Sequence, residues 1–261
     1  MSELKDTQNE RDERNIPIER VGVKALRYPV TVRNQDGSDQ HTVATVAMAV
    51  DLPHHYKGTH MSRFVEVLNS HGQCLDVRHM SGLPKELLKR LEAKRAHVEL
   101  QFPFFRSKPA PVTKKTGMMD YEARFEVEAG AEGKVDFVIT VMVPVATLCP
   151  CSKAISEYGA HNQRGVVTYS VRTKSLVWIE ELIDRVESSA SCELYSLLKR
   201  PDEKAVTERA FENPVFVEDL VRNIAAKTND DPRVTWYRVE AENFESIHNH
   251  NAYAVVLGGE K

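Results

Sequence analysis

Apolar and polar residues change period several times along the first half of the chain. Two segments rich in β-branched residues lie on either side of the turn signal NQDGSD and predict a strand pair. Apolar residues then recur at helical spacing in two segments, the second of which opens on a proline. The period returns to two in two further segments, which predicts another strand pair. In chain order the segments are 21–32, 41–53, 60–72, 84–96, 97–102 and 121–128.

The second half repeats this order, with strands expected at 134–145 and 165–173, two helices, and two closing strands. The helices are expected over 176–189 and 214–227, and the last strands over 233–246 and 251–259. A ββααββ order written twice predicts an α+β fold with two antiparallel four-stranded sheets, each covered on one face by a helix pair. Such units expose sheet edges, which an even oligomer that joins sheets into a ring would remove.

The predicted domain organisation is a charged arm followed by two modules. Residues 1–15 are almost free of large apolar side chains, so we expect a mobile arm there. The first module is expected over 16–132 and the second over 133–261. The two modules show no obvious residue identity, so the repeat is one of architecture.

Composition and charge exclude several classes of protein. The formal net charge of -3 and the pI near 6.4 argue against a nucleic-acid partner, because such domains usually carry a clear basic excess. The sequence shows no signal-peptide or transit-peptide pattern, and no apolar run approaches membrane-spanning length. We therefore expect a cytoplasmic protein with no membrane partner.

Two of the four cysteines stand one residue apart in LCPCSKAISEYGAHNQRG, residues 148–165. Pro144 and Pro150 interrupt strand pairing at and beyond the end of the preceding strand, so we expect Cys149 and Cys151 on a loop. In a reducing compartment, spaced thiols serve metals or chemistry more often than disulfides. The segment therefore predicts a metal site or a catalytic site.

The cysteine pattern favours an open site with mixed ligands over a structural zinc finger. Cys-X-Cys supplies too few ligands for a closed tetrahedral site, and Cys192 is single. One thiolate combined with histidine or glutamate from distant loops leaves a position for water or substrate. The candidate partners are His161, Glu203, Glu245, His248 and His250. Other cysteines and histidines are read most simply as small buried groups or satisfied surface groups, namely Cys74, Cys192, His54, His55, His71, His79 and His97.

Several long segments resemble the prokaryotic type IB GTP cyclohydrolases. They are ATLCPCSKAISEYGAHNQRG (146–165), KGTHMSRF (57–64), QNERDERNIPIERVGVKALRYP (8–29) and SIHNHNAYA (246–254). The resemblance covers nearly the whole chain. It implies the tunnelling fold, in which ββαα units form barrels by oligomerisation, and it argues for a homotetramer with active sites between subunits.

The resemblance also implies an activity and a cofactor. Family members open the guanine ring of GTP at C8, release formate and give 7,8-dihydroneopterin triphosphate, the first step towards tetrahydrofolate and deazapurine tRNA bases. One divalent metal ion per site suits this chemistry, since it lowers the pKa of bound water. Zinc, iron(II) and manganese all remain open, and affinity order alone favours zinc.

Roles are carried over from the family pattern to matching residues. Cys149 and His248 are implied as metal ligands, and Glu203 and His161 as further members of that site, with His161 also a catalytic candidate. Cys151 is assigned to proton transfer during ring opening. Glu218 is implied as the carboxylate that accepts hydrogen bonds from guanine. The expected triphosphate partners are His60, Arg63, Lys153 and Arg164. Glu245 stays open as a ligand or as the group that orients His248.

Two other functions remain open at this point. A related tunnelling-fold enzyme could act on another purine or pterin, for example a reductase of a deazapurine nitrile, although the sequence has no GxGxxG dinucleotide fingerprint. A non-catalytic, metal-stapled purine-binding module predicts bound metal without turnover. Removal of Cys151 separates the enzyme from the module, because only an enzyme loses its chemical step while keeping its metal.

Overall fold

The computed structural model describes residues 7–8, 10–70, 80, 82–130 and 132–260. Its contacts form two compact units. Unit 1 contains Met1–Phe102 and Arg124–Val138, and unit 2 contains Pro103–Ala123 and Ile139–Lys261. These boundaries fall inside strands, so the division into modules at residues 132 and 133 stays a prediction from the repeat. Cys74, His71 and His79 lie outside the described residues.

The described elements follow the predicted order of strands and helices, with additions in the second half. They are β1 Ile18–Arg33, β2 Asp39–Leu52, α1 Met61–Ser70, α3 Gly82–Leu91, β3 Arg95–Pro109, β4 Thr116–Gly130, β5 Val135–Leu148, α4 Pro150–Ile155, β6 Asn162–Thr173, α5 Ile179–Glu187, β7 Cys192–Glu193, α6 Arg200–Glu212, α7 Val217–Asn229, β8 Val234–Asn243 and β9 Ala252–Gly259. No helix in the described ranges is long and apolar enough to cross a membrane.

The strands are antiparallel wherever their register is resolved. Hydrogen-bonded neighbours run in the order β1-β2-β3-β4-β5-β6-β8-β9, and the short β7 pairs with β5. The prediction of two separate four-stranded sheets was therefore wrong, because one strand order includes both sets. The repeated order of strands and helices does not determine whether the two sets of strands pair with each other in one sheet.

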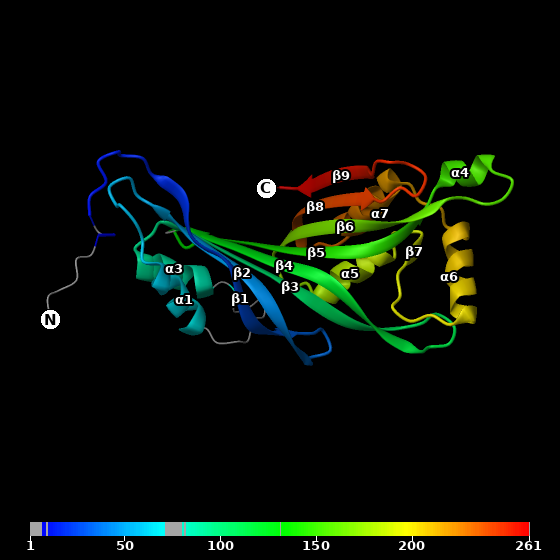
Figure 1. The fold of residues 1–261 in the computed structure, drawn as a ribbon, viewed down its shortest axis with the longest axis horizontal. Coiled ribbons are helices and arrows are strands. Elements are labelled where there is room, and N and C mark those ends of the chain that lie inside the picture. Colours follow the sequence, from blue (N-terminus) through cyan, green and yellow to red (C-terminus); the bar gives the residue numbers. More distant parts are fainter. Residues whose placement is uncertain (1–6, 9, 71–79, 81, 131, 261) are drawn as a thin grey trace. The chain divides into compact units, whose positions relative to one another are not determined.

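In unit 1, α1 and α3 lie side by side against β1 and β2 (Figure 1). Alternate residues of β2 point toward the helices, and Val46, Met48 and Val50 are at most 2% exposed. Phe64 from α1 and Leu87 from α3 are fully buried. Burial of this apolar face is what holds the short helices, since ten-residue helices are marginal by themselves.

Part of the predicted arm is attached to unit 1. The N–H of Gly58 donates to the carbonyl of Gln8 at 3.1 Å, and the N–H of Asp12 donates to the carbonyl of His55 at 3.2 Å. The ammonium of Lys57 contacts the carboxylate of Glu10 at 2.6 Å. Gln8 and residues 10–12 therefore lie along the segment that precedes α1.

In unit 2, α7 lies against β8 and β9 and α5 lies against β6 (Figure 1). The register of β6 and β8 places Val167 opposite Ala241 and Tyr169 opposite Val239, so these buried residues form one helix-covered face. The hydroxyl of Tyr169 hydrogen-bonds Thr228 of α7 at 2.7 Å, which satisfies two polar groups inside this core.

Several predicted boundaries were wrong. The helix expected over 84–96 ends at Leu91, because the chain turns at Glu92 with φ +52° and enters β3 at Arg95. Strand β5 continues through Pro144 to Leu148, since a strand tolerates proline where no N–H is needed. The cysteines are not on an irregular loop: Cys149 caps α4 and Cys151 lies inside it.

Candidate active site

Cys149 stands at the junction of β5 and the short helix α4. It has extended backbone angles, φ -71° and ψ 117°, and its Sγ accepts a hydrogen bond from the N–H of Ser152 at 3.5 Å. Pro150 fits the first helical position because that position needs no N–H donor. Sulfur accepts this bond better as a thiolate than as a thiol. The half-buried Cys149 and the exposed Cys151 therefore share one turn but face different surroundings.

His161 is joined to this turn by backbone hydrogen bonds. The N–H of Cys149 donates to the carbonyl of His161 at 3.1 Å, and the N–H of His161 donates to Oγ of Ser152 at 3.2 Å. Two sequence-predicted site residues, Cys149 and His161, are thus brought together within one chain.

The imidazole of His161 is oriented by groups that the sequence analysis missed or left open. Its Nδ1 lies 3.0 Å from Oε1 of Gln163, whose Nε2 donates to Oγ1 of Thr147 at 2.9 Å. Oε2 of Glu245 lies 3.9 Å from the same Nδ1. In this arrangement Nδ1 carries the proton, and Nε2 is the nitrogen that can bind a metal or exchange a proton. Glu245 thus lies beside His161; its sequence context left it open as a metal ligand or as the group that orients His248.

Gln163 could have been found from the alternation of β6. It occupies the same face of the strand as Gly165 and Val167, and it is only 8% exposed. A long amide side chain at a core-facing position needs hydrogen-bond partners, which is a signal of a specific role.

Leu148 fixes the end of β5 through both of its backbone groups. Its N–H donates to Oγ of Ser191 at 3.0 Å, and its carbonyl accepts from the N–H of Val215 at 3.1 Å. Val215 lies just before α7, so this bond ties the start of that helix to the residue preceding Cys149. Glu218 is exposed in the first turn of α7, where the helix dipole favours a carboxylate.

The strand β6 and the chain after β8 meet at Arg164. The N–H of Phe244 donates to the carbonyl of Arg164 at 2.9 Å, next to the register pair Gly165 and Asn243. A Cβ at Gly165 would lie 2.5 Å from Oδ1 of Asn243 and 3.0 Å from the carbonyl oxygen of Glu242, so a larger residue would require the Asn243 side chain to move. This contact positions Arg164 and Glu245 at the same end of unit 2 as His161.

Three other predicted residues of unit 2 are less closely connected. His248 is exposed, and its ring stacks on His250 with centroids 5.0 Å apart. Glu203 is exposed in the first turn of α6. The ammonium of Lys153 hydrogen-bonds the carbonyl of Phe211 and lies 4.4 Å above the Phe211 ring, so it is already engaged inside the chain.

Among the described residues, no three of the four predicted metal ligands lie close enough together to share one ion. Within the part of the chain that the structure describes, one group of three His, Cys, Asp or Glu side chains has ligating atoms within 4.8 Å of one another. That group is His97, Glu99 and Glu126 of unit 1. The set Cys149, His161, Glu203 and His248 has no such spacing, so its assignment stays a prediction.

Two predicted triphosphate partners line a cavity of unit 1. His60 and Arg63 border a space of about 340 Å³ next to the turn that precedes α1. One guanidinium nitrogen of Arg63 donates to the carbonyl of Arg90 at 3.2 Å, which holds the side chain at the cavity wall. Basic side chains beside the start of α1 suit an anion.

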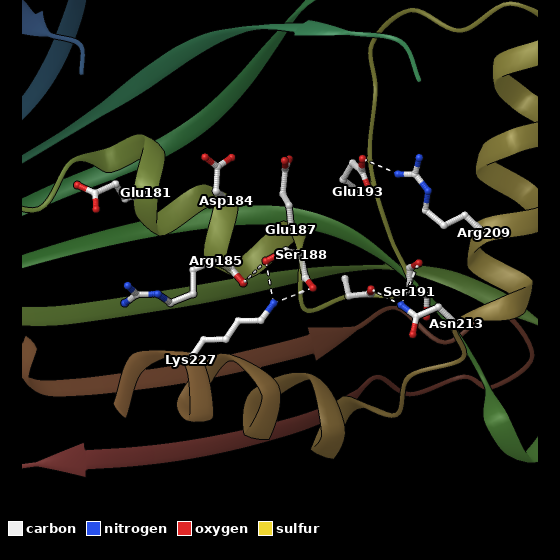
Figure 2. A pocket seen from close by; sticks show the side chains of 11 residues that line it. Glu181, Asp184, Arg185, Glu187, Ser188, Ser191, Glu193, Arg209, Asn213 and Lys227 are labelled. Atoms are coloured by element: carbon white, nitrogen blue, oxygen red, sulfur yellow. Dashed lines mark hydrogen bonds and ion pairs between the residues drawn. The ribbon is translucent and has the colours of Figure 1, made fainter. Parts of the chain in front are cut away.

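Unit 2 contains a cavity of about 800 Å³ that includes none of the predicted site residues. Figure 2 shows its lining, where Glu193 meets Arg209 at 2.8 Å and Lys227 donates to Ser188 at 2.8 Å. Burial alone raises the pKa of Glu193, but hydrogen bonds from Tyr195 and Arg209 hold it below its ordinary value. Ser191 lines this cavity and also binds Leu148, so the cavity borders the β5 end without containing Cys149.

Comparison with known proteins agrees with the resemblance seen in the sequence. The family described as Type I GTP cyclohydrolase folE2 matches residues 4–254. A protein of Akkermansia muciniphila named GTP cyclohydrolase FolE2 is 67% identical over 258 residues, covering 98% of both chains. Its namesake from Nitrosococcus oceani is 55% identical, covering 97% of this chain and 94% of the relative.

Among solved structures, uricase from Arthrobacter globiformis matches with a TM-score of 0.56 at 7% identity, covering 93% of this chain and 94% of the other. Urate oxidase from Bacillus sp. TB-90 also has a TM-score of 0.56, at 8% identity, covering 94% and 100%. At such identity the likeness shows the fold alone, and that fold is the predicted tunnelling fold of the α+β class. With the family match over almost its whole length, the chain belongs to the type I GTP cyclohydrolase folE2 family.

Proposed function

We propose that this chain is a GTP cyclohydrolase that converts GTP and water to 7,8-dihydroneopterin triphosphate and formate by opening the guanine ring at C8. The observation that carries the proposal is the Cys149-Pro150-Cys151 turn bonded to His161, with Gln163 and Glu245 around the imidazole. Family membership supplies the substrate class. The product then serves tetrahydrofolate or deazapurine tRNA base biosynthesis.

A divalent metal ion fits the residues at this turn. Cys149 offers a sulfur that already accepts a hydrogen bond, and His161 offers Nε2. We propose Cys149, His161, Glu203 and His248 as the residues that hold the ion, which is zinc, manganese or iron(II). When bound, such an ion supplies Lewis acidity and lowers the pKa of water.

Three side chains of the turn take separate roles in the proposal. Cys151 is exposed, so it can reach the purine and exchange a proton with it during ring opening. Cys149 binds the metal in this proposal. Its Sγ accepts a hydrogen bond from the N–H of Ser152, which fixes the direction of the side chain. His161 holds a proton on Nδ1 against Gln163, which keeps Nε2 available for a ligand or a proton.

The substrate is recognised by charge and by hydrogen bonding. Glu218 accepts hydrogen bonds from N1–H and the exocyclic amine of guanine, a pattern that adenine lacks. His60, Arg63, Lys153 and Arg164 bind the triphosphate, and Lys153 exchanges its contact with Phe211 for a phosphate oxygen. The resemblance to the family implies active sites between subunits of a homotetramer, and we propose that arrangement for this chain.

The test is turnover of GTP by metal-stripped protein after zinc, manganese or iron(II) is added back. We expect formate and a fluorescent oxidised pterin in equal amounts. Cys151→Ser is expected to abolish turnover and keep the metal, whereas Cys149→Ser loses the metal. Tyr158→Phe is the matched control, since Tyr158 lies in the same segment and is 97% exposed. Bound GTP without formate, under every metal, contradicts the proposal and favours the binding module.

A further inference from the structure

Three metal-ligating side chains converge on one face of the unit 1 sheet. His97 and Glu99 lie two residues apart in β3, and Glu126 lies in β4. One ligating atom from each lies within 4.8 Å of the other two, and all three residues are half-buried. Their neighbours Ala96, Val98 and Leu100 are buried among the core residues, so the three polar groups occupy the opposite face of the sheet.

The imidazole of His97 is incompletely hydrogen-bonded among the described residues. Its Nδ1 is buried and has no hydrogen-bond partner among the described residues. A buried nitrogen without a donor or acceptor beside it costs free energy that a bound cation would recover.

The ion pairs around the cluster do not engage all of its carboxylate oxygens. Nε of Arg124 contacts Oε2 of Glu126 at 3.2 Å, and Arg20 contacts Glu128 at 3.4 Å. Because Arg124 pairs with Oε2 of Glu126, the other oxygen of that carboxylate can still coordinate a cation. Glu99 adds a further carboxylate. Arg20, His97 and Glu128 also line a cavity of about 330 Å³, so there is open space beside His97, although Glu99 and Glu126 do not line it.

We propose that His97, Glu99 and Glu126 form a second divalent-cation site, built entirely from unit 1. One imidazole nitrogen and two carboxylates suit Zn²⁺ and Mn²⁺, and three protein ligands leave positions for water. The site shares no residue with the Cys149 and His161 turn. It does not depend on the proposed reaction, because it can bind metal whether or not the chain turns over GTP.

The experiment measures zinc bound per chain after equilibrium dialysis of the full-length protein, followed by elemental analysis. We expect two zinc ions per chain in the unmodified protein and one in His97→Ala, in Glu126→Gln and in Cys149→Ser. The double variant His97→Ala with Cys149→Ser is expected to bind none. Glu122→Gln is the matched control, because Glu122 is half-buried on the same face of β4, and it should keep both ions.

Cobalt(II) distinguishes the two sites by their ligands. The proposed unit 1 site contains no sulfur, so Cys149→Ser protein loaded with cobalt should show d–d absorption without a sulfur-to-metal charge-transfer band. That absorption should vanish when Glu126→Gln is added. Thermal unfolding of each metal-free variant checks folding, and His97→Gln replaces any His97→Ala protein that fails to fold. A second zinc ion that persists in the His97 and Glu126 variants, or is absent from the unmodified protein, overturns the proposal.

Discussion

Gln163 connects the imidazole of His161 to the end of β5, because one amide group bridges His161 and Thr147. Gln163→Leu leaves Nδ1 of His161 and the hydroxyl of Thr147 without this partner. We expect kcat to fall by about 10- to 100-fold, as is typical when a group that orients a ligand is lost. Gln163→Glu places a carboxylate beside Nδ1. The part of the pH–rate profile that depends on His161 should then shift to higher pH, because a nearby negative charge favours the protonated imidazole.

Steady-state kinetics over a range of pH, with metal content measured on the same samples, test the role of Gln163. Asn162→Ala is the control, since Asn162 is the exposed neighbour on the other face of β6. Equal rates in Gln163→Leu and the control, or an unmoved pH profile in Gln163→Glu, would contradict the assigned role.

Cys192 and Cys151 should differ strongly in reactivity. Burial in β7, with the carboxylate of Glu193 close by, raises the pKa of Cys192 to about 11. At about pH 8 only about a thousandth of this thiol is ionised, so alkylation should be slow. Exposed Cys151 should react first with iodoacetamide, as peptide mass spectrometry can show. Equal labelling of both thiols in the folded protein would show that Cys192 is open to solvent.

At the scale of elements, Asp202 fastens the start of α6 to the turn between β3 and β4. Its two carboxylate oxygens accept hydrogen bonds from the N–H groups of Val112, Thr113 and Lys199 and from the Thr113 hydroxyl, at 2.7 to 2.9 Å. Burial alone raises the pKa of this carboxyl, but the four hydrogen bonds together hold it well below its ordinary value. Glu203 is the next residue in the chain, so these hydrogen bonds of Asp202 also fix the backbone position of that proposed metal ligand.

Asp202→Asn is therefore expected to destabilise the protein at neutral pH. The folded-state pKa is depressed, so the stabilising contribution is fully present above the unfolded pKa near 4 and is lost as pH falls through the folded value. Urea unfolding should show a constant gap between Asp202→Asn and unmodified protein from about pH 7 to about pH 5, and a shrinking gap below about pH 4. Asp219→Asn, which changes a weaker cap contact in α7 and an exposed ion pair with Arg222 at 3.7 Å, is the comparison. A gap that widens in acid would mean that Asp202 is protonated when folded.

Sequence periodicity predicted most elements because each buries one face, and burial requires an apolar residue at the right interval. It failed where local and long-range effects compete. The helix pattern of 84–96 continued past Leu91, but Arg95 joins a ladder whose residues pair with β2. Helix α6 has a weak apolar pattern, with Asp202 and Ala210 as its buried residues, so periodicity could not predict it.

The candidate active site could be predicted from the sequence only in part. The cysteine turn and His161 were accessible from spacing and resemblance, because they lie close together in sequence. Gln163 and the bonds at Leu148 were not, since they depend on Thr147, Ser191 and Val215 meeting at the end of β5. Likewise the sequence alone indicates a satisfied histidine at His97, because Glu126 is distant in the sequence and the pairing of β3 with β4 brings it close.

At the scale of the whole molecule, the strand order ends at β1 and β9, each of which pairs with one strand among the described residues. Strand β9 also exposes apolar side chains, with Tyr253 73% and Leu257 54% exposed. An open edge with exposed apolar groups favours pairing with another copy. These edges support the homotetramer proposed above, in which each active site lies between subunits.

Subunit mixing tests that arrangement directly. Cys151→Ser inactivates the unit 2 half of a site, and the double variant His60→Ala with Arg63→Ala inactivates the unit 1 half. If each site takes its halves from two chains, random mixed oligomers contain about a quarter of sites with both halves intact, and activity should return to about that level. If each site is complete within one chain, every site in the mixture carries a defect and activity stays absent. Co-expression with two affinity tags isolates the mixed oligomers, light scattering gives their mass, and Cys151→Ser mixed with itself sets the background.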